Sequence, residues 1–256
     1  MTICKICGSK SNKIFNTKIL SKYDVSYFKC SSCYFIQTEE PYWIEEAYNS
    51  AITKQDIGLL SRNNYFVNLV SVLINFFFEK KKTFLDYGGG YGIFVRLMRD
   101  NGFDFYRYDT YCENIFASGF DDNQKSDYEL LTSFEVFEHL VDPIQEIDLM
   151  LKKSESVFFS TEIQPKSITN VNDWWYFMPW TGQHISLYSI ESLKFIANKK
   201  GLNFYTNGKT FHLFTKKKIS KILFKIMTKR MFFNFITLLS KPNRMLLNTD
   251  YQNLLK

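Results

Sequence analysis

The chain has 256 residues, 45% of them hydrophobic and 18% aromatic, which is enough for a large buried core, and its 11 Gly and 5 Pro argue against long disordered linkers. The net charge of +6 is uneven, because ten basic residues and no acidic ones lie between Lys209 and Arg244. The N-terminus lacks the features of a secretory signal, and no stretch approaches the ~20 apolar residues of a membrane span, so we expect a cytoplasmic protein.

Residues 1–40 are predicted to form a zinc-binding knuckle. Four of the five cysteines form two C-x-x-C pairs, namely Cys4, Cys7, Cys30 and Cys33. Two such pairs about twenty residues apart are typical of a tetrahedral zinc site, and disulfides are the less expected alternative in a reducing compartment. All four ligands come from the protein, so the Zn²⁺ is expected to be structural. The lysine-rich loop between the pairs leaves nucleic-acid binding open as a rival role.

Two helices are expected next, a short one over residues 41–49 and a longer one over 61–80 with apolar residues at helical spacing. They open a second predicted domain, which spans residues 41–215.

The glycine-rich stretch 84–92 reads as a buried strand, a tight turn and the start of a helix. The spacing is D-x-G-x-G-x-G, formed by Asp86, Gly88, Gly90 and Gly92. Glycine permits the tight turn and lets a ligand approach the backbone amides at the start of the helix. The nicotinamide fingerprint G-x-G-x-x-G would require glycine at position 93, which is Ile93, so the turn fits an adenosylmethionine site better.

A second strand over residues 103–108 is closed by Asp109. An acidic residue about twenty positions after the glycine turn, at the end of a strand, is suited to accept hydrogen bonds from ribose hydroxyls; an ordinary helix cap is the alternative. Residues 117–122 are expected to form a short third strand or a loop edge, and 128–134 a strong strand.

Three motifs carry a family resemblance. The first is the glycine turn, the second is E-V-x-E-H-x-x-D-P from Glu135 to Pro143, and the third is D-W-W-Y at Asp173 followed by G-Q-H ending at His184. Together with the knuckle, they make the chain resemble class I S-adenosylmethionine-dependent methyltransferases, in particular bacterial methyltransferases of sugars and surface polysaccharides. The resemblance implies a Rossmann-like, seven-stranded, mostly parallel α/β sheet with a terminal antiparallel hairpin.

The resemblance also implies roles for single residues. Tyr48 is expected to reach the methionine part of the cofactor, and Phe120 to supply an apolar face to adenine, with Asp121 or Asp122 accepting from the amine. Glu135 is expected near the sulfonium and the mouth of the substrate site, as both a cofactor-binding and a catalytic residue.

Two histidines are the candidate bases. His184 is preferred, because an imidazole can take the proton of a hydroxyl as it attacks the methyl group. His139 could share a face with Glu135, although it could equally only hold the turn. The insertion over residues 162–188 carries tryptophans on which a sugar could stack if they are exposed.

The C-terminal part is expected to contain a helix capped by Ser189, two strands over 202–206 and 210–215 joined by Asn207-Gly208, and a basic helical extension over 216–256. The basic amphipathic pattern of 216–229 could contact a membrane surface, although packing on its own domain is favoured.

The function expected from the resemblance is O-methylation of a sugar, a nucleotide-linked sugar or another precursor of bacterial capsule or surface polysaccharide, including phosphate-derived modifiers. The substrate would be a small molecule and not DNA. The alternatives are an RNA methyltransferase and a non-catalytic scaffold that binds the cofactor.

Overall fold

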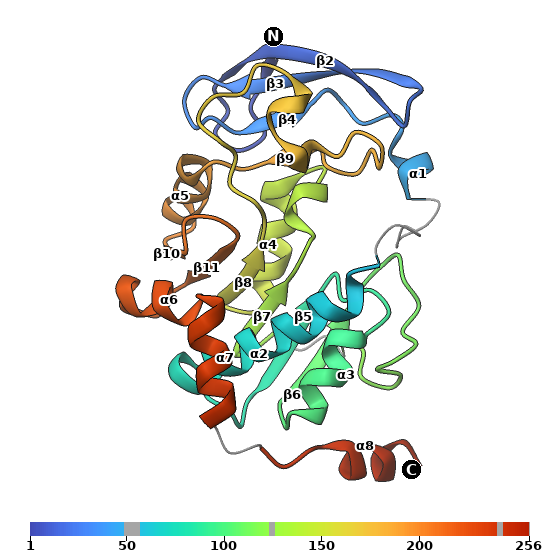
Figure 1. The fold of residues 1–256 in the computed structure, drawn as a ribbon, viewed down its shortest axis with the longest axis vertical. Coiled ribbons are helices and arrows are strands. Elements are labelled where there is room, and N and C mark those ends of the chain that lie inside the picture. Colours follow the sequence, from blue (N-terminus) through green and yellow to red (C-terminus); the bar gives the residue numbers. More distant parts are fainter. Residues whose placement is uncertain (49–56, 123–125, 240–242, 256) are drawn as a thin grey trace.

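The computed structural model describes residues 1–48, 57–122, 126–239 and 243–255. A small N-terminal sheet lies at one end of the elongated molecule, a larger sheet with its helices fills the middle, and the last helix lies at the opposite end (Figure 1). Within the described residues, no helix is long and apolar enough to cross a membrane.

The larger sheet has six strands in the order β10-β11-β8-β7-β5-β6. Its strands are β5 (Thr83–Tyr87), β6 (Asp104–Tyr108), β7 (Leu130–Ser133), β8 (Ser156–Ser160), β10 (Asn203–Thr206) and β11 (Phe211–Thr215). The first four are parallel to one another, whereas β11 runs antiparallel between β8 and β10. This confirms the mixed α/β class and the parallel-rich sheet.

The prediction of seven strands is not confirmed among the described residues. The expected third strand over 117–122 is reduced to a single parallel bridge between Asp121 and Arg107. Gly119 in this stretch has a φ of 84°, outside the extended range that a strand requires. The backbone therefore makes only one pairing with the edge strand β6.

Helices pack on both faces of this sheet. The α-helices of the described residues are α1 (Ile44–Ala47), α2 (Leu59–Phe77), α3 (Ile93–Asp100), α4 (Pro143–Lys153), α5 (Ile190–Lys199), α6 (Lys221–Met227), α7 (Arg230–Leu239) and α8 (Leu247–Leu254). Helices α2, α3, α6 and α7 share one hydrophobic core with one face of the sheet, and α4 and α5 share a second core with the other face. Successive residues of β5 show the alternation, since Phe84 belongs to the first core and Leu85 to the second.

The N-terminal sheet has the order β1-β2-β3-β4-β9. Its strands are β1 (Thr2–Ile3), β2 (Lys10–Ile19), β3 (Tyr23–Cys30), β4 (Ile36–Thr38) and β9 (Ser186–Leu187). The expected ribbon between the two cysteine pairs is the β2–β3 hairpin. Strand β9 lies at the end of the insertion over residues 162–188 and pairs antiparallel with β4. The knuckle is thus hydrogen-bonded to the region that holds His184.

Polar side chains cap the start of two helices. Asp142 caps α4 by accepting from the backbone N–H of Gln145, and Pro143 occupies its first turn. Ser189 caps α5, as expected, in a capping box with Ser192. The helix expected over 41–49 is the shorter α1, and Asn49 lies outside the described residues.

The basic extension packs on the domain. Phe224 and Met227 of α6 are buried, and Ile222 is exposed. At the far end, Asp250 of α8 is buried and accepts hydrogen bonds from the guanidinium of Arg99 at 2.9 and 2.7 Å. A membrane contact of this extension stays a prediction.

Candidate active site and cysteine cluster

The glycine turn lies where β5 ends and α3 begins. Gly88, Gly90 and Gly92 have φ values of 75°, 53° and 85°, which side chains rarely adopt. A Cβ on Gly88 would lie 2.5 Å from Val136, and one on Gly92 would lie 2.5 Å from Asn114. A Cβ on Gly90 would meet nothing within 4 Å. The turn therefore packs tightly at both ends and leaves open space at its centre, which suits close approach of a ligand.

Asp109 faces this turn from the end of β6. One carboxylate oxygen accepts from the N–H of Gly90 at 2.9 Å, and the other accepts from the N–H groups of Tyr111 and Cys112 at 2.8 Å each. Asp109 thus fixes its own loop against the glycine turn, and the oxygen bonded to Gly90 has a lone pair left for a ribose hydroxyl. The ribose role stays a prediction.

Arg107 is a structural residue of this region that the sequence reasoning missed. Its buried guanidinium donates to the carbonyls of Gly90 and Cys112 and to the carboxylate of Asp121. An arginine in the interior of an edge strand was the available signal, because arginine is rarely buried without partners. It ties the loop 109–121 to the glycine turn.

Asp86 lies beneath the turn. Its carboxylate is buried and accepts a hydrogen bond from the hydroxyl of Thr132 at 2.7 Å. Burial raises the pKa of Asp86 to about 7, while the bond from Thr132 opposes the shift.

The region expected to flank adenine is already well packed. Phe120 is buried, and the guanidinium carbon of Arg99 lies 3.7 Å from its ring centroid. Asp121 accepts from Arg107, and Asp122 accepts from the hydroxyl of Tyr128 at 2.8 Å. The adenine contacts of Phe120 and of these acids stay predictions, and one face of the Phe120 ring lies against Arg99.

Glu135 follows β7 at the same edge of the sheet as the glycine turn. Its φ is 55°, an uncommon value for a residue with a side chain and one that concentrates at functional sites. Its N–H donates to the hydroxyl oxygen of Ser160 at 2.9 Å, and that hydroxyl donates to its carboxylate at 2.7 Å. The reciprocal pair holds this backbone conformation at the carboxyl ends of β7 and β8.

The two candidate histidines lie together. His139 ends the 3₁₀ helix η1 (Phe137–His139), His184 precedes β9, and their ring centroids are 5.0 Å apart. The hydroxyl of Tyr48 is 2.8 Å from Nδ1 of His139, and the Tyr48 ring stacks on Tyr111 at 5.4 Å. Tyr48 therefore connects the loop after Asp109 with the histidine pair.

The protonation of His184 follows from its contacts. Its Nδ1 is 2.6 Å from the carbonyl oxygen of Tyr176, so Nδ1 carries the proton and Nε2 keeps a lone pair. Burial lowers the pKa of His184 to about 4. Burial also lowers the pKa of His139 well below its usual value, and the neighbouring His184 lowers it further. Both shifts favour the neutral form of the imidazole at pH 7.

Glu138 completes this cluster and was not among the predicted site residues. Its side chain is fully buried, and no described residue donates a hydrogen bond to either carboxylate oxygen. Nε2 of His139 lies 3.9 Å from Oε1. Burial raises the pKa of Glu138 to about 8, with the charge of Glu135 adding to the shift. The hydroxyls of Tyr176 and Thr161 face the carboxylate and oppose the shift, but both lack hydrogen-bond geometry.

The insertion splits its tryptophans between the core and the surface. It contains two further 3₁₀ helices, η2 (Val171–Asp173) and η3 (Trp175–Phe177). Trp174 is buried, whereas Trp175 and Trp180 are 65% and 57% exposed. The ring of Trp175 is 5.2 Å from that of Tyr176, which in turn is 4.5 Å from His184. The ring of Tyr176 thus lies between the exposed ring of Trp175 and the buried ring of His184.

The cysteine cluster forms as predicted in geometry. The Sγ atoms of Cys4, Cys7, Cys30 and Cys33 all lie within 4.8 Å of one another, which fits the ligand set of a tetrahedral structural zinc. The closest pairs are Cys7–Cys30 at 3.4 Å and Cys4–Cys33 at 3.6 Å. The fifth cysteine, Cys112, is half-buried and lies outside this cluster.

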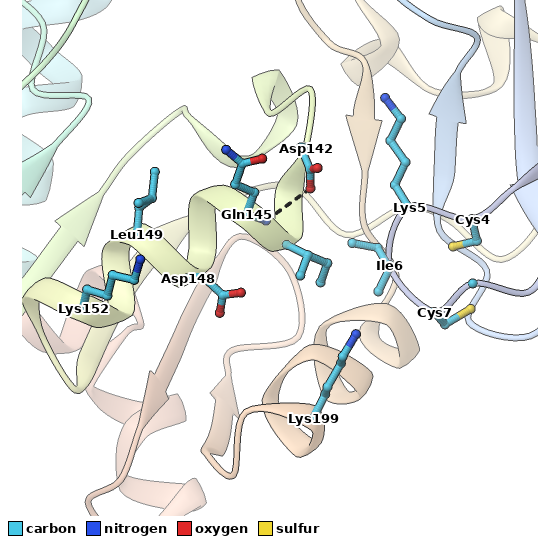
Figure 2. A pocket seen from close by; sticks show the side chains of 12 residues that line it. Cys4, Lys5, Ile6, Cys7, Asp142, Gln145, Asp148, Leu149, Lys152 and Lys199 are labelled. Atoms are coloured by element: carbon cyan, nitrogen blue, oxygen red, sulfur yellow. Dashed lines mark hydrogen bonds between the residues drawn. The ribbon is translucent and has the colours of Figure 1, made fainter.

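A cavity of about 710 Å³ opens between the first cysteine pair and α4 (Figure 2). Its charged lining consists of Lys5 beside the cysteines, Asp142, Asp148 and Lys152 at α4, and Lys199 of α5. Lys5 leaves this region to donate to the carbonyl of Val141 at 2.9 Å, just before α4. None of the predicted cofactor-binding or catalytic residues lines the cavity, so it is separate from the chemistry considered above.

Comparisons with known proteins agree with this architecture. A family model described as a methyltransferase domain matches residues 63–207. No curated protein matches the chain. Similar solved structures include a magnesium protoporphyrin IX methyltransferase from Synechocystis PCC 6803 with bound SAH, which is 10% identical, with 67% of this chain and 92% of that chain covered and a TM-score of 0.45.

Two further structures are similar at the same level. An O-methyltransferase family protein from Burkholderia thailandensis is 11% identical over 70% of this chain and 68% of its own, with a TM-score of 0.44. CalO1, a methyltransferase in calicheamicin biosynthesis in its SAH-bound form, is 12% identical over 69% and 60%, with a TM-score of 0.47. Because these sequence identities and TM-scores are low, the assignment of the chain to a family depends on the family model alone. Because that model spans more than half of the 256 residues, this chain belongs to the methyltransferase-domain family and is an S-adenosylmethionine-dependent methyltransferase.

Proposed function

We propose that this methyltransferase methylates a hydroxyl oxygen of a small carbohydrate, namely a sugar, a nucleotide-linked sugar or another precursor of bacterial capsule or surface polysaccharide. The observation that carries the proposal is the pair of adjacent imidazoles at the carboxyl edge of the sheet, with His184 buried, His139 partly buried and a lone pair on Nε2 of His184. A neutral imidazole next to a cofactor turn suits removal of a proton from an alcohol.

The cofactor would be held by the chain's own polar groups around the glycine turn. Gly90 leaves the backbone accessible at the centre of the turn that Gly88 and Gly92 close at its ends, Asp86 and Asp109 supply carboxylates, and Tyr48 closes the side toward the histidines. Bound S-adenosylmethionine supplies an activated methyl group. Glu135 at the end of β7 would face the positive charge of the sulfonium.

In the proposed reaction, the acceptor hydroxyl forms a new bond from its oxygen to the methyl carbon. The carbon–sulfur bond breaks with its electron pair remaining on sulfur, and the hydroxyl proton passes to Nε2 of His184. The carbonyl of Tyr176 holds the ring in the tautomer that can accept this proton. Tyr48 orients His139 in the same way.

The exposed rings of Trp175 and Trp180 support a carbohydrate acceptor, because flat aromatic faces stack on sugar rings. We further propose that Cys4, Cys7, Cys30 and Cys33 hold a structural Zn²⁺, and that the chain divides into a knuckle (1–40), a methyltransferase domain (41–215) and a basic helical extension (216–256). The geometry of the four Sγ atoms supports the zinc assignment.

The test is transfer of labelled methyl from S-adenosylmethionine to candidate nucleotide-sugars and capsule precursors. Replacing His184 by Asn should slow transfer by roughly 10²–10⁴-fold, the usual contribution of a general base. His212 provides a matched control, because it is also a buried histidine but lies outside the site. Its Nε2 donates to the carbonyl of Thr161, and its Nδ1 accepts from the hydroxyl of Thr206 in the β10–β11 hairpin. The His212→Asn variant should keep the wild-type rate of methyl transfer when the rate is expressed per folded molecule.

Two results would redirect the proposal. Transfer to RNA but not to any carbohydrate would replace the acceptor class, and such binding would weaken steeply with salt. Tight cofactor binding with no transfer to any acceptor would favour a scaffold.

A further inference from the structure

We propose that Glu138, His139 and His184 form a second metal site, distinct from the cysteine cluster, that binds a divalent cation such as Zn²⁺ or Co²⁺. One ligand atom from each residue lies within 4.8 Å of the other two. Ligands at about 2.0–2.1 Å from a tetrahedral zinc are separated by roughly 3.3 Å, so small side-chain movements suffice to close the site. Two histidines and one glutamate form a ligand set known from catalytic zinc.

The second, independent observation is the carboxylate of Glu138. It is fully buried, and no described residue donates a hydrogen bond to either of its oxygens. An ionised carboxylate in such surroundings is strongly unfavourable unless it is paired or coordinates a metal. Nε2 of His139 lies 3.9 Å away, which is close enough to share a cation but too far for a hydrogen bond.

The outer contacts of the two histidines are those that metal ligands require. Nδ1 of His184 donates to the carbonyl of Tyr176, which leaves Nε2 unprotonated for coordination. Nδ1 of His139 lies 2.8 Å from the hydroxyl of Tyr48 and can donate to its oxygen, which frees Nε2 in the same way. Ligating histidines almost always make such a bond through their second nitrogen, because it fixes both tautomer and ring orientation.

The backbone brings the three ligands together from two elements. Glu138 and His139 lie in η1, and the N–H of Ile185 donates to the carbonyl of Glu138 at 2.9 Å, which fixes the neighbouring His184 against η1. Each ligand thus lies on a hydrogen-bonded segment, and the chain supplies three ligands and leaves a coordination position open for a further molecule.

A catalytic role for this open position rests on the proposed function. The binding of a metal ion at the site does not depend on that function. A hydroxyl bound beside a divalent cation loses its proton more readily, because the cation stabilises the negative oxygen. That proton would pass to water, and the oxygen would then bond to the methyl carbon as described above. His184 would in this case hold the cation instead of accepting the proton.

The experiment uses the full chain stripped with a chelator and titrated with Co²⁺. Coordination by thiolates gives an intense sulfur-to-cobalt charge-transfer band, whereas a site of two histidines and a glutamate gives weaker visible bands without it. We expect about two Co²⁺ per chain, one with and one without the thiolate signature. Glu138→Gln, which preserves volume, and His139→Asn should each lose only the second, and His212→Asn should keep both.

The outcomes separate the two proposals. Binding of a single Co²⁺ with the thiolate signature, or retention of the second Co²⁺ by both Glu138→Gln and His139→Asn, would overturn the metal site. Methyl transfer by wild-type protein would still stand in that case, with His184 as base. Loss of the second Co²⁺ in both variants supports the site even if no carbohydrate is ever methylated.

Discussion

The proposed cofactor side and the proposed acceptor side of the candidate active site differ in how completely their polar groups are satisfied. On the cofactor side, Asp109 accepts three backbone N–H groups, and Arg107 donates to two carbonyls and a carboxylate. On the acceptor side, the carboxylate of Glu138 and the hydroxyls of Thr161 and Tyr176 are buried without a hydrogen bond from the described residues. Burying an unpaired polar group costs about 1–3 kcal/mol, and more for a charge.

This contrast indicates that the two sides have different tasks. The cofactor side has a finished backbone frame with open space only over Gly90, so it can receive its ligand without rearrangement. The acceptor side stores unsatisfied groups that a ligand or an ion must complete, as buried polar groups in native proteins generally are paired. The four predictions below separate the two sides, in order of decreasing effect.

Loss of the cysteine cluster should damage the acceptor side alone. Cys33→Ser should release the structural zinc proposed for this cluster, since such an ion contributes on the order of 10 kcal/mol to the folding of small modules, and should expose residues 1–40 to proteolysis. Methyl transfer should be lost, because β4 no longer supports β9 and the neighbouring His184. Affinity for S-adenosylmethionine by calorimetry should stay within about threefold, or ~0.7 kcal/mol. Cys112→Ser is the control, and parallel loss of cofactor affinity would contradict the separation.

Replacing Gly90 at the centre of the glycine turn by Ala should affect only the cofactor side, by weakening the binding of S-adenosylmethionine. Gly90 and Gly201 both have positive φ and open space where a Cβ would be added, so Ala at either position should cost a similar ~1 kcal/mol of stability. Only Gly90→Ala should weaken S-adenosylmethionine binding, by about tenfold or more, or ~1.4 kcal/mol. Equal affinities of the two variants in calorimetry would remove the turn from the cofactor site.

The pH dependence of the free energy of unfolding should contain a contribution from the protonation of Asp86. Its folded pKa of about 7 lies above its unfolded value, so the native state holds a proton that the unfolded state releases. The contribution of Asp86 to stability should therefore fall as pH rises from about 4 to 7, by at most ~1.4 kcal/mol per pH unit. In denaturant titrations, the stability of Asp86→Asn relative to the wild type should rise over this range, whereas that of the half-exposed Asp148→Asn relative to the wild type should stay constant.

The smallest effect is expected at the surface of the insertion. Trp175→Leu should raise the acceptor KM by roughly threefold to tenfold with kcat retained, because stacking on an aromatic ring contributes about 1 kcal/mol. Trp180→Leu is matched in type and exposure and should change KM less, since the ring of Trp175 is the one in contact with Tyr176. A larger change in Trp180→Leu would place the acceptor on the other side of the loop.

The features that were predictable from the sequence are local ones. The glycine turn, the Asn207-Gly208 hairpin and the caps at Asp142 and Ser189 depend on residues close in the chain, where backbone preferences decide the conformation. The stretch 117–122, expected as a strand, shows the limit, because Gly119 and the side chain of Arg107 decide its path.

Long-range contacts could not be read from the sequence. The bond between Tyr48 and His139 joins an N-terminal helix end to the edge of the central sheet, and the Asp250–Arg99 pair joins the last helix to α3. Neither the periodicity of a helix nor a motif records which distant partner a polar side chain meets. Glu138 was overlooked for the same reason, since its burial depends on the insertion that folds over it.

Strand β9 has a consequence for how the protein is made. The N-terminal sheet is synthesised first, yet its β4 edge stays without its partner until residues 186–187 have left the ribosome. An uncovered strand edge invites pairing with other chains, so a newborn polypeptide is most exposed to aggregation while the central sheet is still being translated. Because β9 begins two residues after His184, closing that edge and bringing His184 beside His139 become one folding event.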